Sequence, residues 1–313
     1  MPFFSVIIPL YNKEAFIEST LKSVLQQTFQ DFEIIIVDDG STDESFQLAS
    51  NFKSANIFIF KQKNQGVSVA RNLGIEHASS KYIALVDADD VWHENHLNEL
   101  KKQIDLFPNA GLYCNNYEIL HSKNVRKKAS FNFNYNTECL IVEDYFKASI
   151  INSVAWTSAV GFSKEIFKTL GGFNPDLKTA QDLDLWIRFA LKHKVCFNPT
   201  VTMLYKFYID NSLSKNEKDY NYLRYNFINS YREEAETNPS LKLYLDVNRY
   251  ALALRSKLNN NMQLHEIVKK EIDFKNLNFK QVVLLNVPKT VLKFIKGFQS
   301  FLIERKIYIT AYK

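Results

Sequence analysis

Two aspartates follow one of the most apolar segments of the chain. Asp87 and Asp89 come directly after residues 82–86, and Asp90 follows them. Residues two positions apart in an extended backbone point to the same side, so we expect the first two carboxylates to lie together. Such hard oxygen ligands suit Mg²⁺ or Mn²⁺, which makes Asp87 and Asp89 the candidate metal ligands. The alternative is a solvated turn, and for Asp90 we favour the N-cap of a helix that begins at Val91.

A second acidic pair, Asp38 and Asp39, follows the apolar run 34–37. Ser41 and Glu44 have the spacing of a helix capping box, which does not explain two successive acids before the glycine. Carboxylates at this position can accept hydrogen bonds from a ribose or from a base N–H. Neither a G-x-G-x-x-G sequence nor a P-loop sequence is present, so we expect phosphate charge to be met through a divalent cation.

The elements that must position these acids alternate between β-rich runs and helical patterns. The expected strands are residues 4–8, 32–37, 56–60 and 82–86, and the expected helices are about 14–27, from 41 onward, and 67–77. Apolar strands without polar alternation indicate a mostly parallel, Rossmann-like α/β sheet with helices on both faces. Ligands of such sheets bind at the carboxyl ends of the strands, where both acidic pairs lie.

The rest of the chain changes character twice. From residue 111 the pattern is mixed, with strands expected at 111–117 and 195–207 and a helix at 181–194; beyond 215 it reads as successive helices. We therefore divide the chain into a region 1–214, with a first half 1–110 and a second half 111–214, and a helical C-terminal extension 215–313.

Charge and composition exclude several classes of protein. The chain carries 39 basic and 34 acidic side chains, and 46% of its residues are hydrophobic, which excludes intrinsic disorder. Residues 1–204 hold 20 basic and 23 acidic side chains, whereas residues 205–313 hold 19 and 11. The three cysteines have no zinc or disulfide spacing, so we expect a reducing compartment. We interpret the N-terminus as a strand rather than a signal peptide, and expect no transmembrane helix.

Four blocks of sequence, taken in order, resemble the family 2 inverting glycosyltransferases of the GT-A fold. They are Ser-Val-Ile-Ile-Pro-Leu-Tyr-Asn at 5–12, Ile-Val-Asp-Asp-Gly-Ser-Thr-Asp at 36–43, Asn-Gln-Gly with Ala-Arg-Asn-Leu-Gly at 64–74, and Val-Asp-Ala-Asp-Asp at 86–90. A fifth block, residues 171–188, begins with Gly-Gly-Phe and resembles the family's segment that carries the catalytic base. The resemblance covers about residues 3–210.

The resemblance implies a nucleotide-diphosphate-sugar donor site with bound Mn²⁺ or Mg²⁺. The implied donor-binding residues are Pro9, Tyr11, Asp38, Asp39, Asn64, Gly66, Arg71, Asp87, Ala88 and Lys206. Asp87 would contact the ribose or the metal, and Asp89 would ligate the metal on the diphosphate. The metal would stabilise the departing nucleotide diphosphate as a Lewis acid.

Inverting transfer needs a carboxylate that removes the proton of the acceptor hydroxyl. Asp182 matches the family's base position, and Asp184 is the alternative. An Asp in the first turn of a helix also favours the helix dipole, with Thr179 as a cap, so a structural role stays open. Trp156, or less favourably Trp186, would offer an aromatic face to an acceptor sugar; each fits the core as well.

Two positions depart from the family pattern. Gln181 stands where many members have a Glu beside the base. Tyr208 stands where many members carry a His that completes the metal shell, which leaves the third protein ligand open. The neighbouring Lys206 takes a frequent Arg position and would meet the diphosphate as a point charge.

The basic C-terminal region contains an amphipathic segment, residues 289–305. Its apolar stripe is Val291, Phe294, Ile295, Phe298 and Leu302, and its lysines are Lys289, Lys293 and Lys296. This is the composition of a helix that lies on an anionic membrane surface. A helix docked on the body, with its lysines in water, is an equal alternative. Nucleic acid is not an expected partner, because no nucleic-acid-binding module accompanies the basic residues.

These observations predict a cytoplasmic transferase, with peripheral attachment to the inner face of the membrane as an added expectation. It would move a hexose, preferably from a UDP-sugar, to a hydroxyl of a bacterial lipid-linked or surface glycan such as lipopolysaccharide, by single displacement. A non-catalytic glycan- or nucleotide-binding scaffold on a degenerate transferase fold is the alternative, motivated by Tyr208. A nucleotidyltransferase is disfavoured, because it would usually have a glycine-rich loop after the first strand.

Overall fold

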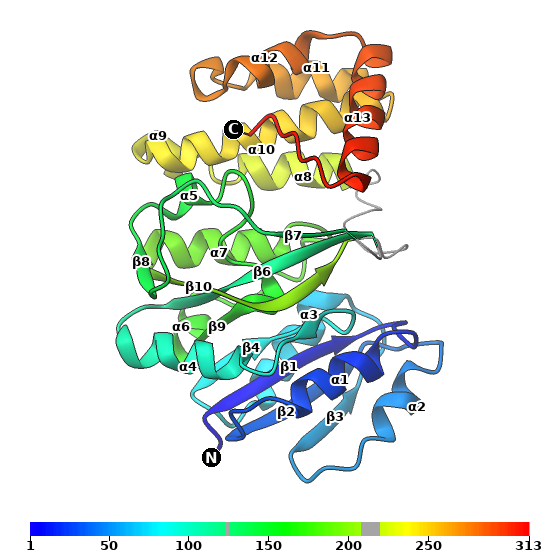
Figure 1. Cartoon of the computed structure of the whole chain (residues 1–313), viewed down its shortest axis with the longest axis vertical. Coiled ribbons are helices and arrows are strands. Elements are labelled where there is room, and N and C mark those ends of the chain that lie inside the picture. Colours follow the sequence, from blue (N-terminus) through cyan, green and yellow to red (C-terminus); the bar gives the residue numbers. More distant parts are fainter. Residues whose placement is uncertain (123–124, 208–219, 313) are drawn as a thin grey trace.

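The computed structural model describes residues 1–122, 125–207 and 220–312. Its ten described strands are β1 (Phe4–Leu10), β2 (Phe32–Asp38), β3 (Ile57–Lys61), β4 (Tyr82–Leu85), β5 (Val91–Trp92), β6 (Leu112–Ser122), β7 (Val125–Lys128), β8 (Leu140–Val142), β9 (Val160–Ser163) and β10 (Val195–Lys206). They form one sheet in the order β3-β2-β1-β4-β9-β6-β10-β5, with β7 on β6 and β8 on β10 (Figure 1).

The first half of the sheet is parallel, as the apolar strands predict. β1 pairs in parallel with β2 and β4, and β2 pairs in parallel with β3. Every residue of β2 and β4 is buried, which explains why these strands show no polar alternation. Beyond β4 the sheet is mixed, because β9 runs antiparallel to both β4 and β6, while β6 and β10 are parallel.

Helices cover both faces of the sheet. They are α1 (Ile17–Leu25), α2 (Ser45–Ser50), α3 (Val67–His77), α4 (His96–Leu106), α5 (Tyr145–Ala148), α6 (Lys164–Thr169) and α7 (Gln181–Lys192). Figure 1 shows α1 and α4 in front of the sheet and α3, α6 and α7 behind it. Gly74 lets α3 approach closely, because a Cβ there would lie 2.7 Å from Cγ2 of Ile7 in β1.

Two expected helix caps are wrong. α2 begins at Ser45 with Glu44 as an N-cap that makes no side-chain hydrogen bond, so Ser41 and Glu44 form no capping box. The Ser41 hydroxyl instead accepts a hydrogen bond from the Asn12 N–H at 3.1 Å. Asp90 caps no helix, because the residues after it form the short strand β5 and α4 begins only at His96.

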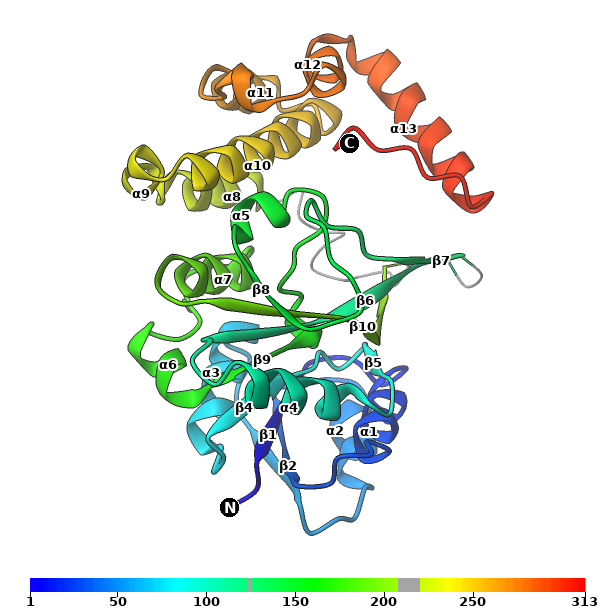
Figure 2. The same cartoon turned by 60° about the vertical axis from the view of Figure 1, so that its left-hand side comes forward.

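Helices alone make up the described C-terminal part. They are α8 (Asn221–Asn229), α9 (Arg232–Thr237), α10 (Pro239–Leu258), α11 (Met262–Lys270), α12 (Phe279–Asn286) and α13 (Lys289–Glu304). The others gather around the long central α10, and α13 descends along one side (Figure 2). The change from sheet to helices falls between Lys206 and Asn221, and the boundary expected at 214/215 lies outside the described residues. Among the helices described, none has the length and apolar character needed to span a membrane.

Candidate functional site

Hydrogen bonds join the two loops that follow β1 and β2. The Asn12 side chain accepts from the Thr42 N–H at 2.9 Å, and the Lys13 N–H donates to the Ser45 hydroxyl at 2.6 Å. The Asp39 N–H donates to the Leu10 carbonyl at 2.8 Å. The carboxyl ends of β1 and β2 are therefore held at a defined distance, as a binding edge requires.

Asp39 organises the loop that leads into α3. Its carboxylate accepts hydrogen bonds from the Gln65 N–H and the Gly66 N–H, both at 2.8 Å, and from the Gln62 side chain at 2.7 Å. Gly40 allows this approach: its φ is +75°, and a Cβ there would lie 2.9 Å from the Asn64 nitrogen. Sequence reasoning assigned Asp39 to a ligand alone, whereas in the structure its carboxylate holds the loop 62–66.

Asp38 is fully buried and only partly satisfied. One carboxylate oxygen accepts from the Ser41 N–H at 3.3 Å. The other has no hydrogen-bond partner and lies 4.0 Å from the Lys61 ammonium group. A buried oxygen without a donor is costly, so Asp38 retains the capacity to accept a hydrogen bond from a bound nucleoside.

Asp87 and Asp89 each pair with a basic side chain. Arg71 lies 2.6 Å from the Asp87 carboxylate, and Lys13 lies 2.5 Å from that of Asp89. The same-side argument from extended geometry is wrong, because β4 ends at Leu85 and the Asp90 N–H closes a turn on the Asp87 carbonyl at 3.0 Å. The two carboxylates are thus presented by a turn rather than by a strand.

A buried carboxyl group lies behind this pair. Burial raises the pKa of Asp90 well above its usual value, and the charges of Asp89 and Asp87 raise it further. Burial lowers the pKa of Lys206, against which the charges of Asp90 and Asp89 act. Lys206 therefore lies within the electrostatic reach of this acidic turn, at the end of β10, as expected of a side chain that meets phosphate.

The acidic turn fits a divalent cation that keeps water and phosphate ligands. Asp87 and Asp89 are partly exposed, with side-chain exposures of 33% and 18%, and supply hard oxygen donors. Within the described ranges no cluster of three or more His, Cys, Asp or Glu side chains is suited to a metal. A cation would therefore take two carboxylates and share them with Arg71 and Lys13. Tyr208, the position on which a third ligand depends, lies outside the described residues.

Asp182 lies at the start of α7 with a partly exposed side chain. One carboxylate oxygen accepts from the Leu183 N–H at 2.8 Å, and the other lies 3.5 Å from the Thr157 hydroxyl. The N-cap of α7 is Ala180, in a left-handed conformation, so Thr179 is not the cap. A carboxylate in this first turn is favoured by the helix dipole, and although each oxygen has a donor, the contact to Thr157 is long and the side chain is partly exposed.

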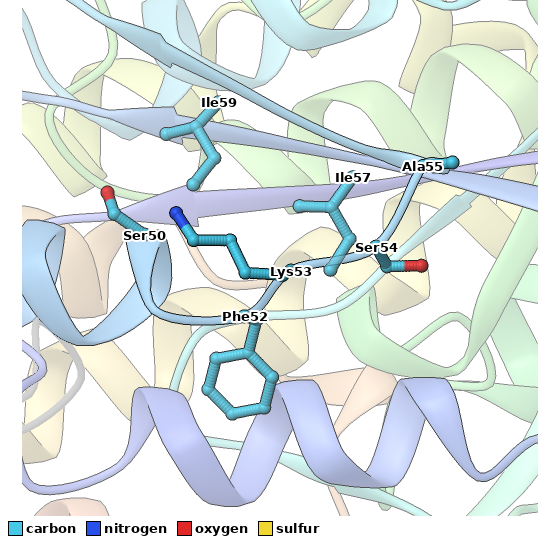
Figure 3. A pocket seen from close by; sticks show the side chains of 7 residues that line it. All are labelled: Ser50, Phe52, Lys53, Ser54, Ala55, Ile57 and Ile59. Carbon is cyan, nitrogen blue, oxygen red and sulfur yellow. The ribbon is translucent and has the colours of Figure 1, made fainter.

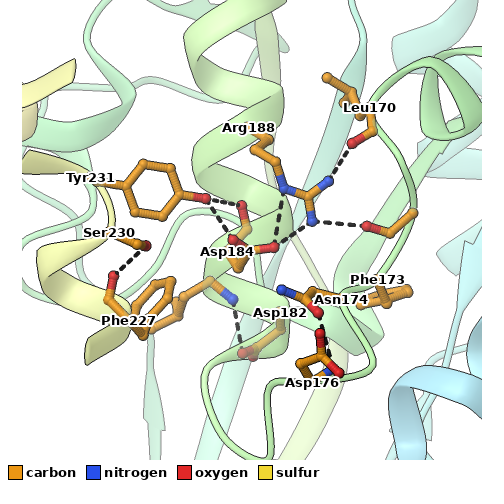
Figure 4. A network of polar contacts seen from close by, with 12 residues as sticks. Leu170, Phe173, Asn174, Asp176, Asp182, Asp184, Arg188, Phe227, Ser230 and Tyr231 are labelled. Atoms are coloured by element: carbon orange, nitrogen blue, oxygen red, sulfur yellow. Dashed lines mark hydrogen bonds and ion pairs between the residues drawn. The ribbon is translucent and has the colours of Figure 1, made fainter. Parts of the chain in front are cut away.

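Asp184 is locked into a structural network (Figure 4). Its side chain accepts from Arg188 through two guanidinium nitrogens and from the Tyr231 hydroxyl, the latter at 2.6 Å. Arg188 also donates to the carbonyls of Leu170, at 2.6 Å, and Gly172, at 2.8 Å. With both carboxylate oxygens engaged and the side chain buried, Asp184 is not suited to remove a proton from a substrate.

The loop that leads into α7 is fastened to the first half of the chain. The Asn72 side chain of α3 donates to the Phe173 carbonyl at 2.8 Å and accepts from the Phe173 N–H at 3.0 Å. The Arg71 guanidinium lies over the Phe173 ring, 5.2 Å from its centroid. The neighbouring residues 71 and 72 thus connect the acidic turn to the segment that carries Asp182.

The two candidate tryptophans differ. Trp186 is fully buried among Phe162, Phe173 and Phe189, so its expected contact with an acceptor is wrong: the apolar face of α7 places it in the core. Trp156 is partly exposed, and its ring centroid lies 4.4 Å from that of Tyr205. Trp156 alone remains a candidate platform for a sugar.

The other predicted donor residues line the same edge with different exposure. Pro9 belongs to β1, Tyr11 is exposed in the loop after it, and Asn64 is exposed before α3. Gly66 is the N-cap of α3, with φ of +96°. Ala88 is buried, and its carbonyl accepts from the Thr20 hydroxyl at 2.9 Å.

A hollow of about 500 Å³ lies elsewhere, on the outer edge of the sheet. Figure 3 shows the side chains that line it, from the end of α2, the connection after it and β3. None of the predicted site residues is among them. The candidate site is therefore the polar strand-end edge and not this hollow.

Sequence reasoning did not find several residues that shape the site. Lys13 directly follows the Tyr-Asn of the first block, so its position in the sequence could have indicated that it lies at the site. Ser158, which accepts from the Asp87 N–H at 3.0 Å, lies 71 positions away in sequence. Arg188 and Tyr231 act through contacts that only the folded chain reveals.

Comparisons with known proteins agree on one family. The sequence profile described as glycosyl transferase family 2 matches residues 5–171. An uncharacterised glycosyltransferase of Rickettsia felis is 31% identical over 199 residues, covering 61% of this chain and 31% of that protein. TuaG of Bacillus subtilis, described as a glycosyltransferase of teichuronic acid biosynthesis, is 28% identical over 69% of this chain and 83% of its own length. The chain spans less than a third of the first two relatives it matches.

Solved structures share the fold. Staphylococcus aureus TarS 1–349 in complex with UDP-GlcNAc aligns with a TM-score of 0.58 at 17% identity, over 86% of this chain and 90% of that one. A mannosyltransferase of Pyrobaculum calidifontis in complex with GDP-Man and Mn²⁺ aligns with a TM-score of 0.61 at 17% identity, over 99% of this chain and 84% of that one. The architecture is the GT-A fold, as expected from the sequence.

Proposed function

The chain belongs to glycosyl transferase family 2, and from this premise we propose that it transfers a hexose with inversion from a nucleotide-diphosphate sugar to a glycan hydroxyl. The observation that carries the proposal is the contrast between two acids of α7. Asp184 is fully engaged, whereas Asp182 keeps a partly exposed carboxylate at the start of the helix. A carboxylate so placed is suited to act as a general base.

In the proposed reaction Asp182 accepts the proton of the acceptor hydroxyl while that oxygen attacks the anomeric carbon. The bond between the sugar and the diphosphate breaks on the opposite face, and the nucleotide diphosphate leaves with the bonding electrons. Lys206 and Arg71 supply positive charge beside the acidic turn. When bound by Asp87 and Asp89, Mn²⁺ or Mg²⁺ would supply Lewis-acid stabilisation of the leaving group.

The donor edge supports a nucleoside as the recognised group. Asp38 offers an unpartnered buried oxygen, and Asp39 holds the loop 62–66 beside it. We propose a UDP-hexose as the donor, since the TarS complex contains a uridine nucleotide. For the acceptor we propose a lipid-linked or surface glycan, with Trp156 as a sugar platform. The three cysteines are free, which fits the reducing cytoplasmic side on which we place the reaction.

Nucleotide release measured over a panel of UDP- and GDP-sugars, with Mn²⁺ or Mg²⁺ and a glycan acceptor, tests the proposal. We expect metal-dependent release with one donor class. A non-catalytic scaffold would release no nucleotide from any donor.

Replacement of Asp182 identifies the base. Asp182→Asn should lower kcat by about 10³-fold while the donor dissociation constant stays within about threefold, because the base acts on the acceptor. Asp176→Asn, an exposed acid on the same loop, is the matched control and should retain activity. Near-normal turnover of Asp182→Asn would refute the assignment.

A further inference from the structure

The last described helix turns much of its apolar side away from the protein. Of the predicted stripe, Phe294 is 75% exposed, Phe298 51% and Val291 42%. Leu292 and Leu302 are the buried residues of α13, and of these two Leu292 belongs to the hydrophobic core of the protein. The helix is therefore in contact with α10, but most of its apolar stripe is left uncovered.

The lysines of α13 lie on the opposite side of the helix. At about 100° per residue, Lys289, Lys293 and Lys296 centre on a direction roughly opposite to Phe294 and Phe298. Leu292 lies between the two faces. The helix contacts the protein on the side of Leu292 and leaves its apolar face outward. Lys293 is exposed, whereas Lys289 donates a hydrogen bond to the Asn260 side chain and burial lowers the pKa of Lys296.

Other exposed apolar side chains flank this helix. Phe279, at 82% exposure, and Val283 lie in α12, and Ile307 and Ile309 follow α13. Isolated exposed apolar residues are ordinary, but a series of large ones along one terminal segment marks an interaction surface.

The charge of residues 279–306 indicates which kind of partner binds this apolar surface. Residues 279–306 contain six basic side chains and one acidic one, Glu304. Two copies meeting through this face would bring like charges together, which disfavours a second copy of the chain. An anionic lipid surface accepts both features, since the phenylalanines enter the acyl boundary while the lysines reach the headgroups.

We propose that α13 is an interfacial helix that attaches the protein to a bilayer containing anionic lipid. The C-terminal tail supports its orientation. The Tyr308 hydroxyl donates to the Arg126 carbonyl at 3.2 Å, and Lys127 lies 4.3 Å from the centroid of the Tyr308 ring. These contacts tie the segment after α13 to the β6–β7 hairpin, and β6 runs toward the side of the molecule where α13 stands (Figure 1).

The attachment therefore brings toward the bilayer the side of the protein at which β6 ends. This orientation suits a lipid-linked acceptor, a consequence that rests on the proposed function. The attachment itself does not.

Vesicle flotation of the full chain tests the attachment. The probes are vesicles of phosphatidylcholine with and without phosphatidylglycerol. Each lysine near an anionic surface contributes about fivefold to binding, so combined replacement of Lys289, Lys293 and Lys296 by Gln should weaken binding about 100-fold. Phe294→Ser with Phe298→Ser should weaken it at least about tenfold.

Matched controls lie on the body. Lys168, Lys192 and Lys194 replaced together by Gln remove the same charge, and Leu106→Ser removes one exposed apolar side chain. Both controls should bind vesicles like the unmodified chain. Equal binding by the α13 variants, binding that ignores anionic lipid, or no binding by the unmodified chain would overturn the proposal. Dimerisation that is lost in the phenylalanine variant would do so too, because it would assign the face to a second copy.

Nucleotide release with a water-soluble acceptor separates the two proposals. The α13 variants should keep this activity within about twofold, since α13 lies away from α7 and Phe294 and Phe298 are exposed (Figures 1 and 2). Vesicle binding without nucleotide release contradicts only the proposed function. Release without vesicle binding contradicts only the attachment.

Discussion

The strand-end edge of the body and the C-terminal helices are held by different interactions. At the edge, Asp39, Asp87 and Asp89 each accept short, charge-assisted hydrogen bonds with a fixed direction. In the helices, fully buried leucines such as Leu245 and Leu264 pack without direction around a buried ion pair, between Arg249 and Asp246 at 2.8 Å. Directional contacts place individual atoms, which chemistry requires, whereas apolar packing sets the position of a whole helix and leaves its outer face free for a surface.

The two regions meet behind the proposed base. The Tyr231 hydroxyl, between α8 and α9, binds Asp184 of α7 at 2.6 Å. Burial raises the pKa of Tyr244, in α10, to about 12, and the charge of Asp182 adds to the increase. The helical region is thus in electrostatic contact with the segment that carries Asp182, and the predictions below test how far the two regions differ.

The largest effect is expected at the edge. Asp39→Asn replaces one acceptor oxygen by an amide NH₂ group that faces the Gly66 N–H, so we expect the free energy of unfolding to fall by about 2–4 kcal/mol. Donor affinity should fall with it, because the loop 62–66 loses its anchor. Urea unfolding and donor titration measure both quantities.

Asp105→Asn is the matched control for this substitution. Asp105 pairs with Lys101 on the surface of α4, and its loss should change the free energy of unfolding by less than about 0.5 kcal/mol. Equal effects of the two variants would remove the distinction between the edge and the rest of the surface.

The next effect is expected where the regions meet. Tyr231→Phe removes the hydroxyl that binds Asp184 and leaves a buried carboxylate oxygen short of a donor, so the free energy of unfolding should fall by about 1–2 kcal/mol. Tyr225→Phe, which removes one of several partners of Glu271 in the C-terminal region, should cost less because Glu271 keeps its contacts to Asn229 and Arg232 and reaches solvent. Urea unfolding of both variants gives the comparison, and a larger loss for Tyr225→Phe would contradict it.

Two buried histidines allow a comparison by pH. Burial lowers the pKa of His96, in the body, to about 3 even though a hydrogen bond to Thr202 opposes it. Burial also lowers the pKa of His265, in α11, and a hydrogen bond to Ala253 opposes that change. Between pH 6.5 and about 3, His96 binds a proton in the unfolded chain but not in the folded protein. The free energy of unfolding therefore falls as the pH falls through this range.

Replacement of each histidine by Asn should flatten this dependence. His96→Asn should remove up to about 1.4 kcal/mol per pH unit from the slope of unfolding free energy against pH, and His265→Asn should remove less. Urea unfolding at a series of pH values from 4 to 7 gives the slopes, which correspond to a difference of about one bound proton between the unfolded and folded states. A steeper change for His265→Asn would reverse the comparison.

The smallest effect is expected on the outer face of α13. Phe294→Ala should change the free energy of unfolding by less than about 0.5 kcal/mol, because the ring is 75% exposed and its loss leaves no cavity. Thermal unfolding in the absence of lipid measures it. A loss of 2 kcal/mol, about the cost of emptying a core site, would show that this face is packed in solution.

The sequence predicted the strands and the acidic edge because their signals are local. Uninterrupted Val and Ile runs mark β1 and β2, and the bounds of α3, 67–77, agree with the expected helix. Local signals failed where a turn or a distant partner decides the geometry. The turn at Asp87–Asp90 takes the place of extended backbone, and Ser41 binds Asn12 instead of capping α2.

Distant partners account for most of what could not be predicted at the site. The choice between Asp182 and Asp184 depends on Arg188 and on Tyr231, which lies 47 positions beyond Asp184. The sequence made Trp186 the less favoured alternative to Trp156, and the packing of α7 then places Trp186 in the core. A residue type and its spacing therefore nominate a role, but burial and hydrogen-bond partners decide it.

The paired hydrogen bonds between Asn72 and Phe173 join segments that are 101 positions apart. During synthesis the first of them leaves the ribosome long before the second, and N-terminal parts of a chain generally fold first. The loop before α7 therefore acquires its shape against a surface that is synthesised earlier. Residues 1–110 serve as a template on which the segment before α7 completes its fold.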